Sequence, residues 1–295
     1  LRWYRHGIEA AARDARADLI HVPASLPVRS HRIPLILTIH DAIPWLHPEW
    51  FTRANALQQK LLMRRAAQRA ARIITVSESA RDDLIGVLGI THVDAIHEGI
   101  SPAFSPGLRN PAWLAARFDV SAPVVLSVGT PEPRKNLVTT LRAYARIVRD
   151  APTASLLLVG GGGWRNADLE SEIARTPGRV ARAGHVAFEE LTRIYASADC
   201  FLFPSLMEGF GFPPLEAMAS GIPVVCSDRP SLPEVVSDAA RLCDAFDAEA
   251  LAAACLDVMA GSGEMRGHGI AHAARFTWTA TAEETTAAYR RSLST

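Results

Sequence analysis

The sequence has 295 residues, of which 48% are apolar and 21% charged, a composition that argues against disordered, collagen-like and low-complexity proteins. Its 31 basic residues are balanced by 31 acidic ones, so it lacks the overall positive charge typical of nucleic-acid-binding proteins, and we expect no nucleic acid among its partners. No apolar run reaches the length of about 18 residues that predicts a transmembrane helix, so we expect a soluble or peripheral protein.

Short apolar runs typical of β-strands alternate with longer helical patterns, which predicts βαβ units and parallel sheets. In the first part of the chain, strands are expected at 17–22, 35–40 and 72–76, with a helix from Arg53 to Ala71 between the last two. A Pro/Gly-rich stretch at 99–107 then breaks the pattern and is the best candidate for a linker between domains. With only three expected strands, the part before the linker is predicted to be an incomplete domain.

The alternation restarts after the linker, which predicts a complete doubly wound domain. The expected strands are 123–128, 154–159, 179–183, 200–204 and 223–227. The expected helices are 137–150, 189–197, 213–220 and 248–260. The predicted fold class is therefore α/β, with two parallel-sheet domains.

The most informative segment runs from Phe201 to Gly221, where an apolar strand leads into a loop with two glycines and then into a helix that opens at Pro213. In open α/β sheets such a junction lies at the edge where ligands bind, and the amides of a helix N-terminus attract anions such as phosphate. Glu208 in the loop and Glu216 in the first turn of the helix add acceptors suited to ligand hydroxyls. Glu216 alone could simply complement the helix dipole, but the combination favours a ligand site.

A second strand-loop-helix junction carries two adjacent cations, Arg134 and Lys135, just before the helix expected at 137–150. An arginine can bind two phosphate oxygens at once and a lysine supplies a compact charge, so this pair is suited to a diphosphate. The alternative is a solvated pair of surface cations.

His40 and Asp41 follow an apolar run in the first part of the chain. A histidine in this position is either a satisfied residue at the edge of the core or a catalytic group. Asp41 either fixes the tautomer of His40 or caps the next segment. The residues by themselves leave both alternatives open.

Three other patterns predict no separate chemistry. Gly160–Gly163 follows a strand but matches neither the dinucleotide fingerprint nor the phosphate-binding loop, so we expect a loop at the ligand edge. His268 and His272 have the spacing of two zinc ligands but lack the accompanying glutamate, and no metal site is expected. No C-x-x-C pair occurs, and buried free thiols in a reducing cytosol are expected for Cys200, Cys226, Cys243 and Cys255.

Two segments together, Val128 to Leu137 and Pro204 to Ala219, resemble family 4 of the retaining glycosyltransferases. The resemblance extends to Thr38–Asp41, Val76–Ser79 and Ser231–Val236 and covers essentially the whole chain. It implies the GT-B architecture, in which two Rossmann-like domains face a cleft.

The resemblance also implies a division of the chain. Residues 1–107 would form a partial N-terminal, acceptor-side domain, and residues 108–275 would form the nucleotide-sugar-binding domain. Residues 276–295 would form a closing helix that packs back on the N-terminal domain.

By the same resemblance, Glu208 would contact hydroxyls of the donor sugar and Glu216 the ribose of the nucleotide. Arg134 and Lys135 would hold the diphosphate, where charge grows as the glycosidic bond breaks, and His40 would meet the sugar near the reacting carbon. The residues assigned to catalysis are His40, Arg134, Lys135 and Glu208. The residues assigned to donor binding are Gly129, Thr130, Arg134, Lys135, Glu208, Gly209, Phe210, Gly211, Phe212 and Glu216. The resemblance implies no metal and no cofactor, and no Asp-x-Asp cluster occurs in a suitable loop.

Two departures from the family pattern are visible. Many members carry Arg directly after the glycine of the first motif, where this chain has Thr130, so phosphate contact is expected to move to Arg134. The family's first strand and its glycine-bearing loop would lie upstream of Leu1, so we expect the chain to bind donor and to turn it over poorly.

The leading interpretation is the transfer of a hexose from a nucleotide diphosphate sugar to a saccharide or lipid-linked acceptor. The string Gly129 to Asn136 resembles bacterial mannosyltransferases of polysaccharide assembly, which favours GDP-mannose over a UDP-sugar as co-substrate. Two other classes stay open: a GT-B-like sugar-nucleotide epimerase and a non-catalytic subunit that binds sugar nucleotides.

The expected helix from Arg53 to Ala71 carries a basic surface with no acid among its cations, which are Lys60, Arg64, Arg65, Arg69 and Arg72. Such a surface is either a solvated helix face or a contact for anionic lipid or a lipid-diphosphate acceptor. The expected localisation is cytoplasmic, with peripheral contact at the inner membrane face.

Overall fold

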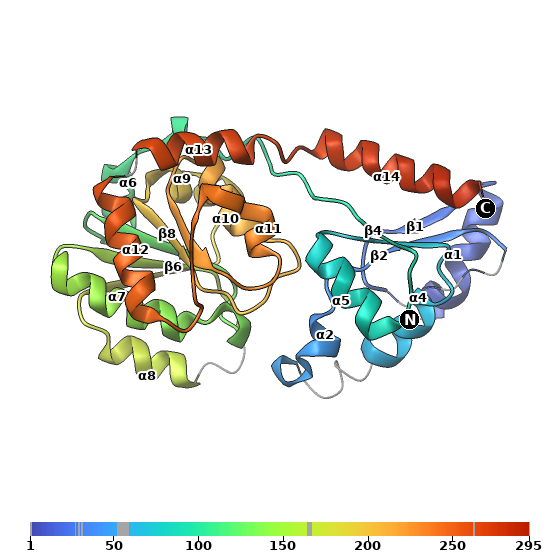
Figure 1. The fold of residues 1–295 in the computed structure, drawn as a ribbon, viewed down its shortest axis with the longest axis horizontal. Helices are drawn as coiled ribbons and strands as arrows, with labels where there is room; N and C mark the ends of the chain where they lie inside the picture. The colour runs from blue at the N-terminus through green and yellow to red at the C-terminus, as the bar shows by residue number, and fades with distance from the viewer. Residues whose placement is uncertain are drawn as a thin grey trace. The chain divides into compact units, whose positions relative to one another are not determined.

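The computed structural model describes residues 2–294 except 27, 29, 31, 52–58, 164–166 and 262. The chain forms two compact units (Figure 1). Unit 1 comprises Leu1–Gly99, Glu208–Phe210 and Thr277–Thr295, and unit 2 comprises Ile100–Met207 and Gly211–Phe276. The first division therefore falls after Gly99, at the start of the Pro/Gly-rich stretch, whereas the sequence places it after residue 107.

Unit 1 is built on a four-stranded parallel sheet with the sequential order β1-β2-β3-β4. Its strands are β1 Ile20–Val22, β2 Leu35–Thr38, β3 Arg72–Thr75 and β4 Val93–Ala95. Three of them lie where the sequence predicts strands, but β4 is missed because three residues are too few to show an alternating pattern. Its helical elements are α1 Arg2–Asp14, α2 Ile43–Leu46, η1 Pro48–Trp50, η2 Gln59–Met63, α4 Arg64–Ala67, α5 Glu78–Leu88 and α14 Trp278–Leu293.

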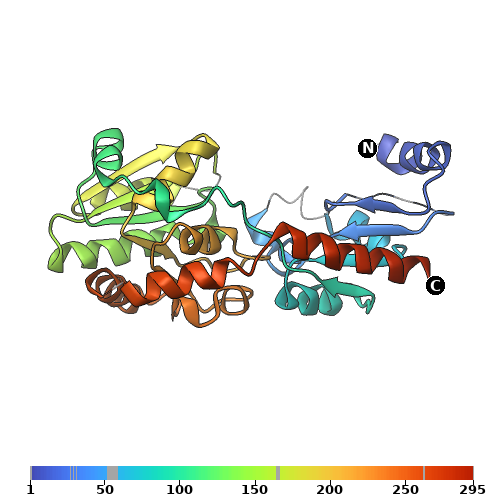
Figure 2. The same cartoon turned by 90° about the horizontal axis from the view of Figure 1, so that it is seen from above.

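Helices cover both faces of this sheet (Figure 1). Successive side chains of a strand point to opposite faces, so Leu35 and Leu37 pack in the cluster with α4 and α5, while Ile36 packs against Ala288 of α14. The hydroxyl of Tyr289 in α14 also lies 2.6 Å from His21 Nδ1 in β1. The last helix of the chain thus completes the core of unit 1, and both chain ends lie in this unit (Figure 2).

The helix expected at 53–71 is described only from Gln59 onward. There the chain forms the π-helical turn η2 and the short helix α4, which ends at Ala67. Arg72 does not belong to this helix, because it begins β3 and its guanidinium donates to Asp94 Oδ1 at 2.9 Å.

Unit 2 is built on a six-stranded parallel sheet with the order β10-β9-β8-β5-β6-β7, so the strand order reverses between β5 and β8. Its strands are β5 Val124–Val128, β6 Ser155–Val159, β7 Arg179–Gly184, β8 Cys200–Phe203, β9 Val224–Ser227 and β10 Arg241–Cys243. All five expected strands are confirmed. The sixth, β10, escapes prediction because it is short and its first two residues are exposed.

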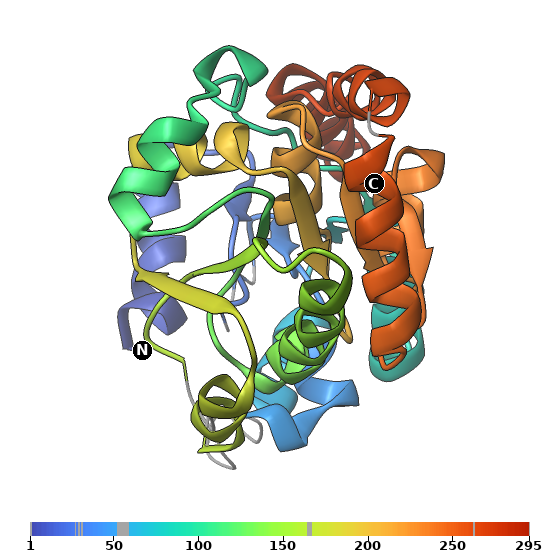
Figure 3. The ribbon, with the colours of Figure 1, turned by 90° about the vertical axis from the view of Figure 1, so that its left-hand side faces the viewer.

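Helices pack on both faces of this sheet (Figure 3). One face packs against α7 and α12, which supply most of the helical residues of the main apolar cluster, and the other packs against α9 and α10. Cys200, Cys226 and Cys255 are buried free thiols in this core, whereas Cys243 is only partly buried. The helices of unit 2 are α6 Pro111–Phe118, α7 Leu137–Asp150, α8 Ala167–Arg175, α9 Phe188–Ser197, α10 Phe212–Ala219, α11 Leu232–Val236, α12 Ala248–Ala260 and α13 Gly263–Ala273, with short 3-10 turns η3 Pro106–Leu108, η4 Pro133–Lys135 and η5 Ser237–Ala239.

Among the described residues, none of the helices combines the length and the apolar character that crossing a bilayer requires.

Candidate functional site

The reversal point of the unit 2 sheet brings together the two segments that carry most of the predicted site. One loop follows β5 and contains Gly129 and the turn η4, and the other follows β8 and leads to α10. In open α/β sheets, ligands bind outside the carboxyl ends of the strands at this point, because the loops on either side diverge there. The topology therefore makes this edge the candidate site of unit 2.

The two loops are joined by hydrogen bonds around Arg134. Its carbonyl oxygen accepts from the amide of Leu206 at 2.7 Å and from the hydroxyl of Ser205 at 3.0 Å. Its guanidinium Nη1 donates to the carbonyl of Met207 at 3.3 Å. Because these bonds link the loops at three points, the position of Arg134 is fixed by both.

Arg134 also forms an ion pair that the sequence interpretation missed. Its Nε lies 2.6 Å from Glu132 Oε1, and the Glu132 side chain is only 9% exposed. A guanidinium has five N–H donors in a fixed plane, so this pair orients the group and leaves it able to engage further acceptors. Arg134 thus enters the site as one half of an ion pair. The spacing E-x-R was the only signal for it in the sequence.

Lys135 is 7% exposed, and its Nζ lies 4.8 Å from the ring centre of Phe203 in β8. Burying an ammonium group costs free energy unless other groups compensate its charge, and a cation above an aromatic ring gains part of that compensation. The alternative of two solvated surface cations is therefore wrong for Lys135. Its burial beside the carboxyl end of β8 suits a role in binding an anion.

Asn136 connects this turn to two other loops. Its backbone is left-handed, with φ at 53°, a conformation that asparagine tolerates better than most residues. Its side-chain amide donates to the carbonyls of Pro204 at 3.1 Å and Ala245 at 2.7 Å, and its oxygen accepts from Thr139 at 2.8 Å. Asn136 therefore holds η4 in place, a role that sequence reasoning did not assign.

Helix α10 begins one residue earlier than predicted, at Phe212, after Gly211. Gly211 has φ at 126°, and a Cβ atom there would lie 3.0 Å from Leu232 Cδ2, so the position favours glycine. Because the helix starts at Phe212, Glu216 lies in its second turn and not in the first, which corrects the prediction. The next two residues, Pro213 and Pro214, have no amide hydrogen, so fewer donors face an anion here than a helix N-terminus usually offers.

The pKa of Glu216, an acid of this edge, is strongly perturbed. Burial raises the pKa of its carboxyl group to about 7, while the Tyr195 hydroxyl and the charge of Lys135 act in the opposite direction. These interactions place Glu216, Lys135 and Tyr195 close together. A carboxyl group that titrates near neutral pH in a ligand-binding edge is typical of functional sites.

The raised pKa predicts a pH-dependent effect of Glu216→Gln on stability. The folded state binds the Glu216 proton more tightly than the unfolded chain, so ionised Glu216 opposes folding increasingly as pH rises from about 4.5 to above 7. We expect the variant to unfold about 2–4 °C higher than the parent at pH 8.5, a change of about 1 kcal/mol after allowance for partial exposure. At pH 4.5 the two melting temperatures should agree. Scanning fluorimetry at both pH values tests this. An equal gain in melting temperature at both would show that ionised Glu216 does not oppose folding.

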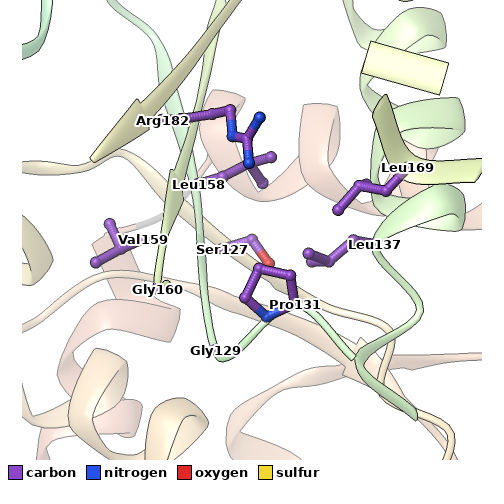
Figure 4. Close-up of a pocket in the computed structure, with 9 residues that line it drawn as sticks. All are labelled: Ser127, Gly129, Pro131, Leu137, Leu158, Val159, Gly160, Leu169 and Arg182. Atoms are coloured by element: carbon purple, nitrogen blue, oxygen red, sulfur yellow. The ribbon is translucent and has the colours of Figure 1, made fainter. Parts of the chain in front are cut away.

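A narrow hollow lies beside the same edge, on the α7 side (Figure 4). It has room for at most about one water molecule, so it is too small for a sugar nucleotide. Gly160 and Gly129 both line it, and a Cβ atom on Gly160 would lie 2.1 Å from the carbonyl oxygen of Gly129. The glycine run that begins at Gly160 therefore allows two loops to touch at this edge. The residues that line the hollow are Ser127, Gly129, Pro131, Leu137, Leu158, Val159, Gly160, Leu169 and Arg182.

His40 lies in unit 1, directly after β2. Its Nε2 is 3.8 Å from Glu98 Oε1, and the His40 side chain is 43% exposed. Burial raises the pKa of Glu98, and the adjacent imidazole opposes this shift. Asp41 Oδ1 accepts from the amide of Ile43 at 2.9 Å, at the start of α2. This bond gives Asp41 the capping role, which is one of the two expected alternatives.

The loop Glu208–Phe210 groups with unit 1 and packs against the backbone of His40. A Cβ atom on Gly209 would lie 2.6 Å from the His40 carbonyl oxygen, and Ser77, the N-cap of α5, donates to the Gly209 carbonyl at 2.7 Å. Glu208 itself is 8% exposed. The structure therefore brings His40 and the loop of Glu208 together in unit 1, and Arg134, Lys135 and Glu216 together in unit 2.

The two histidines with zinc spacing have separate partners. His272 Nε2 lies 2.8 Å from the carbonyl of Val235, and His268 Nε2 lies 3.5 Å from Asp238 Oδ1. In the part of the chain that the structure describes, no three His, Cys, Asp or Glu residues are grouped as metal ligands.

Models of glycosyltransferase families match both halves of the chain. Residues 122–261 match the model of glycosyl transferases group 1, and residues 1–104 match that of glycosyltransferase family 4. A relative from Escherichia coli, O-antigen chain mannosyltransferase B, is 31% identical over 291 residues, which are 95% of this chain and 76% of the relative. D-inositol 3-phosphate glycosyltransferase of Segniliparus rotundus is 32% identical over 213 residues, which are 68% of this chain and 47% of that protein.

Solved structures share the fold. Sucrose-phosphate synthase from Thermosynechococcus elongatus superposes with a TM-score of 0.77 at 24% identity, covering 96% of this chain and 76% of that one. Anabaena HepE in complex with UDP-glucose superposes with a TM-score of 0.77 at 21% identity, covering 95% and 81%. These similarities, with the two parallel sheets, confirm the predicted GT-B class.

Proposed function

This chain belongs to glycosyltransferase family 4, and we propose that it transfers a hexose, with mannose favoured, from a nucleotide diphosphate sugar to a saccharide or lipid-linked acceptor. The observation that carries this proposal is the reversal point of the unit 2 sheet, where Arg134, Lys135 and Glu216 gather. Two cations and a hydroxyl-binding carboxylate are the groups that a nucleoside diphosphate requires.

The proposed donor is GDP-mannose. Its support is the E. coli relative, whose name is that of a mannosyltransferase, and the string Gly129 to Asn136. The rival donor is a UDP-sugar, because HepE, which shares the fold, was solved with UDP-glucose.

The proposed reaction breaks the bond between the anomeric carbon of the sugar and a diphosphate oxygen. It forms a bond from that carbon to the oxygen of an acceptor hydroxyl with retention of configuration, and the hydroxyl proton passes to the leaving diphosphate. Negative charge grows on the leaving diphosphate, and Arg134 and Lys135 stabilise it because they are already in position. Glu216 accepts hydrogen bonds from the ribose, Glu208 from the donor sugar, and His40 contacts the sugar. No metal or cofactor is part of this proposal.

Nucleotide binding tests the proposal first. Thermal unfolding of the protein with GDP, UDP and ADP should show a concentration-dependent rise in melting temperature, largest for GDP, because a ligand that binds only the folded state stabilises it. A larger shift in melting temperature with UDP would favour a UDP-sugar as the donor in place of GDP-mannose. If none of the three nucleotides shifts unfolding at millimolar concentration, the donor site is not where we place it.

Product analysis then separates the three classes of function. Incubation with GDP-mannose and a range of saccharide acceptors, followed by NMR, should show a new glycosidic bond whose anomeric configuration matches that of the donor. An epimerase would instead change the configuration of the sugar nucleotide without an acceptor. A binding subunit would leave the sugar nucleotide intact.

The exposed cations after Gln59 support a further element of the proposal, contact with an anionic membrane surface. Arg64, Arg65 and Arg69 are exposed, as is the apolar side chain of Leu61, and neither η2 nor α4 contains an acid. Such a surface is attracted to anionic lipid.

We expect the triple variant R64E/R65E/R69E to lose most of its binding to vesicles that contain phosphatidylglycerol, measured by co-sedimentation at low salt. The matched control is R142E/R146E/R149E, a triple charge reversal on α7 of unit 2. Equal binding of the parent protein to neutral and anionic vesicles would rule out this contact.

A further inference from the structure

Tyr195 in α9 is a fully buried tyrosine whose hydroxyl lacks an aligned hydrogen bond. Its side chain has no exposed surface, and within the described part of the chain the hydroxyl has no partner that meets hydrogen-bond geometry. A buried hydroxyl without a partner costs free energy, so such a group calls for a physical explanation. Tyr144, the other fully buried tyrosine among the described residues, donates instead to two carbonyls, at 2.8 and 3.0 Å.

The ring of Tyr195 is held in one orientation by two aromatic neighbours. Its centre lies 5.5 Å from that of Phe104, edge to face, and 5.6 Å from that of Phe201 in β8. Phe201 in turn stacks on Phe203 at 5.7 Å, and Phe203 carries the ammonium group of Lys135 above its ring. This row of rings leads from Tyr195 to the cation assigned to the diphosphate.

The polar group that Tyr195 faces is the Glu216 carboxylate. The two groups influence each other: burial raises the pKa of the phenol and the carboxylate adds to this shift, while the phenol opposes the rise that burial causes in the pKa of Glu216. Tyr195 therefore acts as the donor and Glu216 as the acceptor of any bond between them. The pair lies between α9 and α10, on the β8 face that also holds Lys135.

We propose that Tyr195 is a positioning residue for Glu216: its buried hydroxyl acts as a donor toward the Glu216 carboxylate before a nucleotide binds, and so keeps that carboxylate ionised and oriented to accept the ribose hydroxyls. This inference rests on the proposed function, since it takes Glu216 to be the ribose-binding group. The aromatic row keeps the phenol in place before the ligand arrives, which lowers the entropy cost of ordering the carboxylate on binding.

The charged groups on the other elements around α10 have partners elsewhere. From α13, Arg266 donates to the carbonyl of Gly221, His272 binds the carbonyl of Val235, and His268 pairs with Asp238. Glu234 lies on α11 and has its own interactions. Tyr195 from α9 and Lys135 from η4 are the groups that act on Glu216, and both favour its ionised form.

The test is the pH profile of nucleotide affinity in Tyr195→Phe. In the parent protein, affinity for GDP should rise as pH increases through about 7, because the ionised carboxylate accepts from two ribose hydroxyls. Loss of the donor that favours the ionised carboxylate should raise the midpoint of this rise by about one pH unit or more. At pH 7 affinity should fall about tenfold, and above pH 9 it should return toward that of the parent. Isothermal calorimetry with GDP between pH 5.5 and 9.5 measures the midpoint of the affinity profile and the affinity at each pH.

Tyr144→Phe is the matched control, since it also removes one buried hydroxyl from unit 2, and it should leave the midpoint unchanged. A fall in GDP affinity by the same factor at every pH in Tyr195→Phe would assign the residue a merely structural role and overturn the inference. Failure of the parent protein to bind GDP, UDP or ADP would instead overturn the proposed function, so the two failures are distinguishable.

Discussion

Lys135→Met is expected to lower the turnover of the sugar nucleotide by about two to three orders of magnitude. The ammonium group is buried above Phe203, at the carboxyl end of β8, where neighbouring water screens its charge poorly. A cation held in this way needs no rearrangement as charge grows on the leaving diphosphate, so its removal acts mainly on the transition state. Methionine keeps most of the volume of the side chain, which limits the damage to packing.

This effect can be measured without knowledge of the acceptor, by monitoring the release of GDP as GDP-mannose is hydrolysed to GDP and mannose. The chain has only two lysines, and the other, Lys60, lies in unit 1. Lys60→Met is therefore a matched control, with turnover expected to stay within about twofold of the parent, as for a surface substitution. Retention of full turnover by Lys135→Met, in a variant that melts normally, would remove Lys135 from the reaction.

Alanine substitutions of Glu216 and Glu208 are expected to impair different properties, nucleotide binding and turnover respectively. Glu216→Ala should weaken GDP binding by about 10- to 100-fold, because a ribose hydroxyl loses its bond to a charged group, worth about 1.5–3 kcal/mol. Glu208→Ala should leave GDP affinity nearly unchanged and should reduce the turnover of GDP-mannose by a similar factor. The physical reason is that free GDP contains the ribose but lacks the sugar that Glu208 is assigned to contact.

Calorimetry gives the GDP affinity of each variant, and the hydrolysis assay gives its turnover of GDP-mannose. Glu249, an exposed acid of α12, supplies a control variant, Glu249→Ala, for which both values should stay near those of the parent. Unchanged GDP affinity in Glu216→Ala would end the assignment of Glu216 to the ribose. A loss of GDP affinity in Glu208→Ala as large as that in Glu216→Ala would end the division of roles.

Glu132, Asn136 and Tyr195 show what the sequence did not reveal about the candidate site. Glu132 forms an ion pair with Arg134, and Tyr195 acts on Glu216 from the facing helix. Asn136 holds the turn η4 by hydrogen bonds to two other loops. Their residue types carry no signal by themselves, because glutamate, asparagine and tyrosine are common in loops and helices. Only the folded chain shows which partner each one meets.

The sequence by itself determined the α/β class and most of the elements, since strands and helices of sufficient length repeat their apolar residues with a local period. It also determined the junctions after β5 and β8, because prolines, glycines and charged residues concentrate there. Tertiary structure alone decided the burial of Lys135, the near-neutral pKa of Glu216 and the capping role of Asp41. The reason is physical: desolvation and hydrogen bonding depend on groups that lie far apart in the chain, and α14, which covers the unit 1 sheet from the opposite end of the sequence, shows how far such contacts extend.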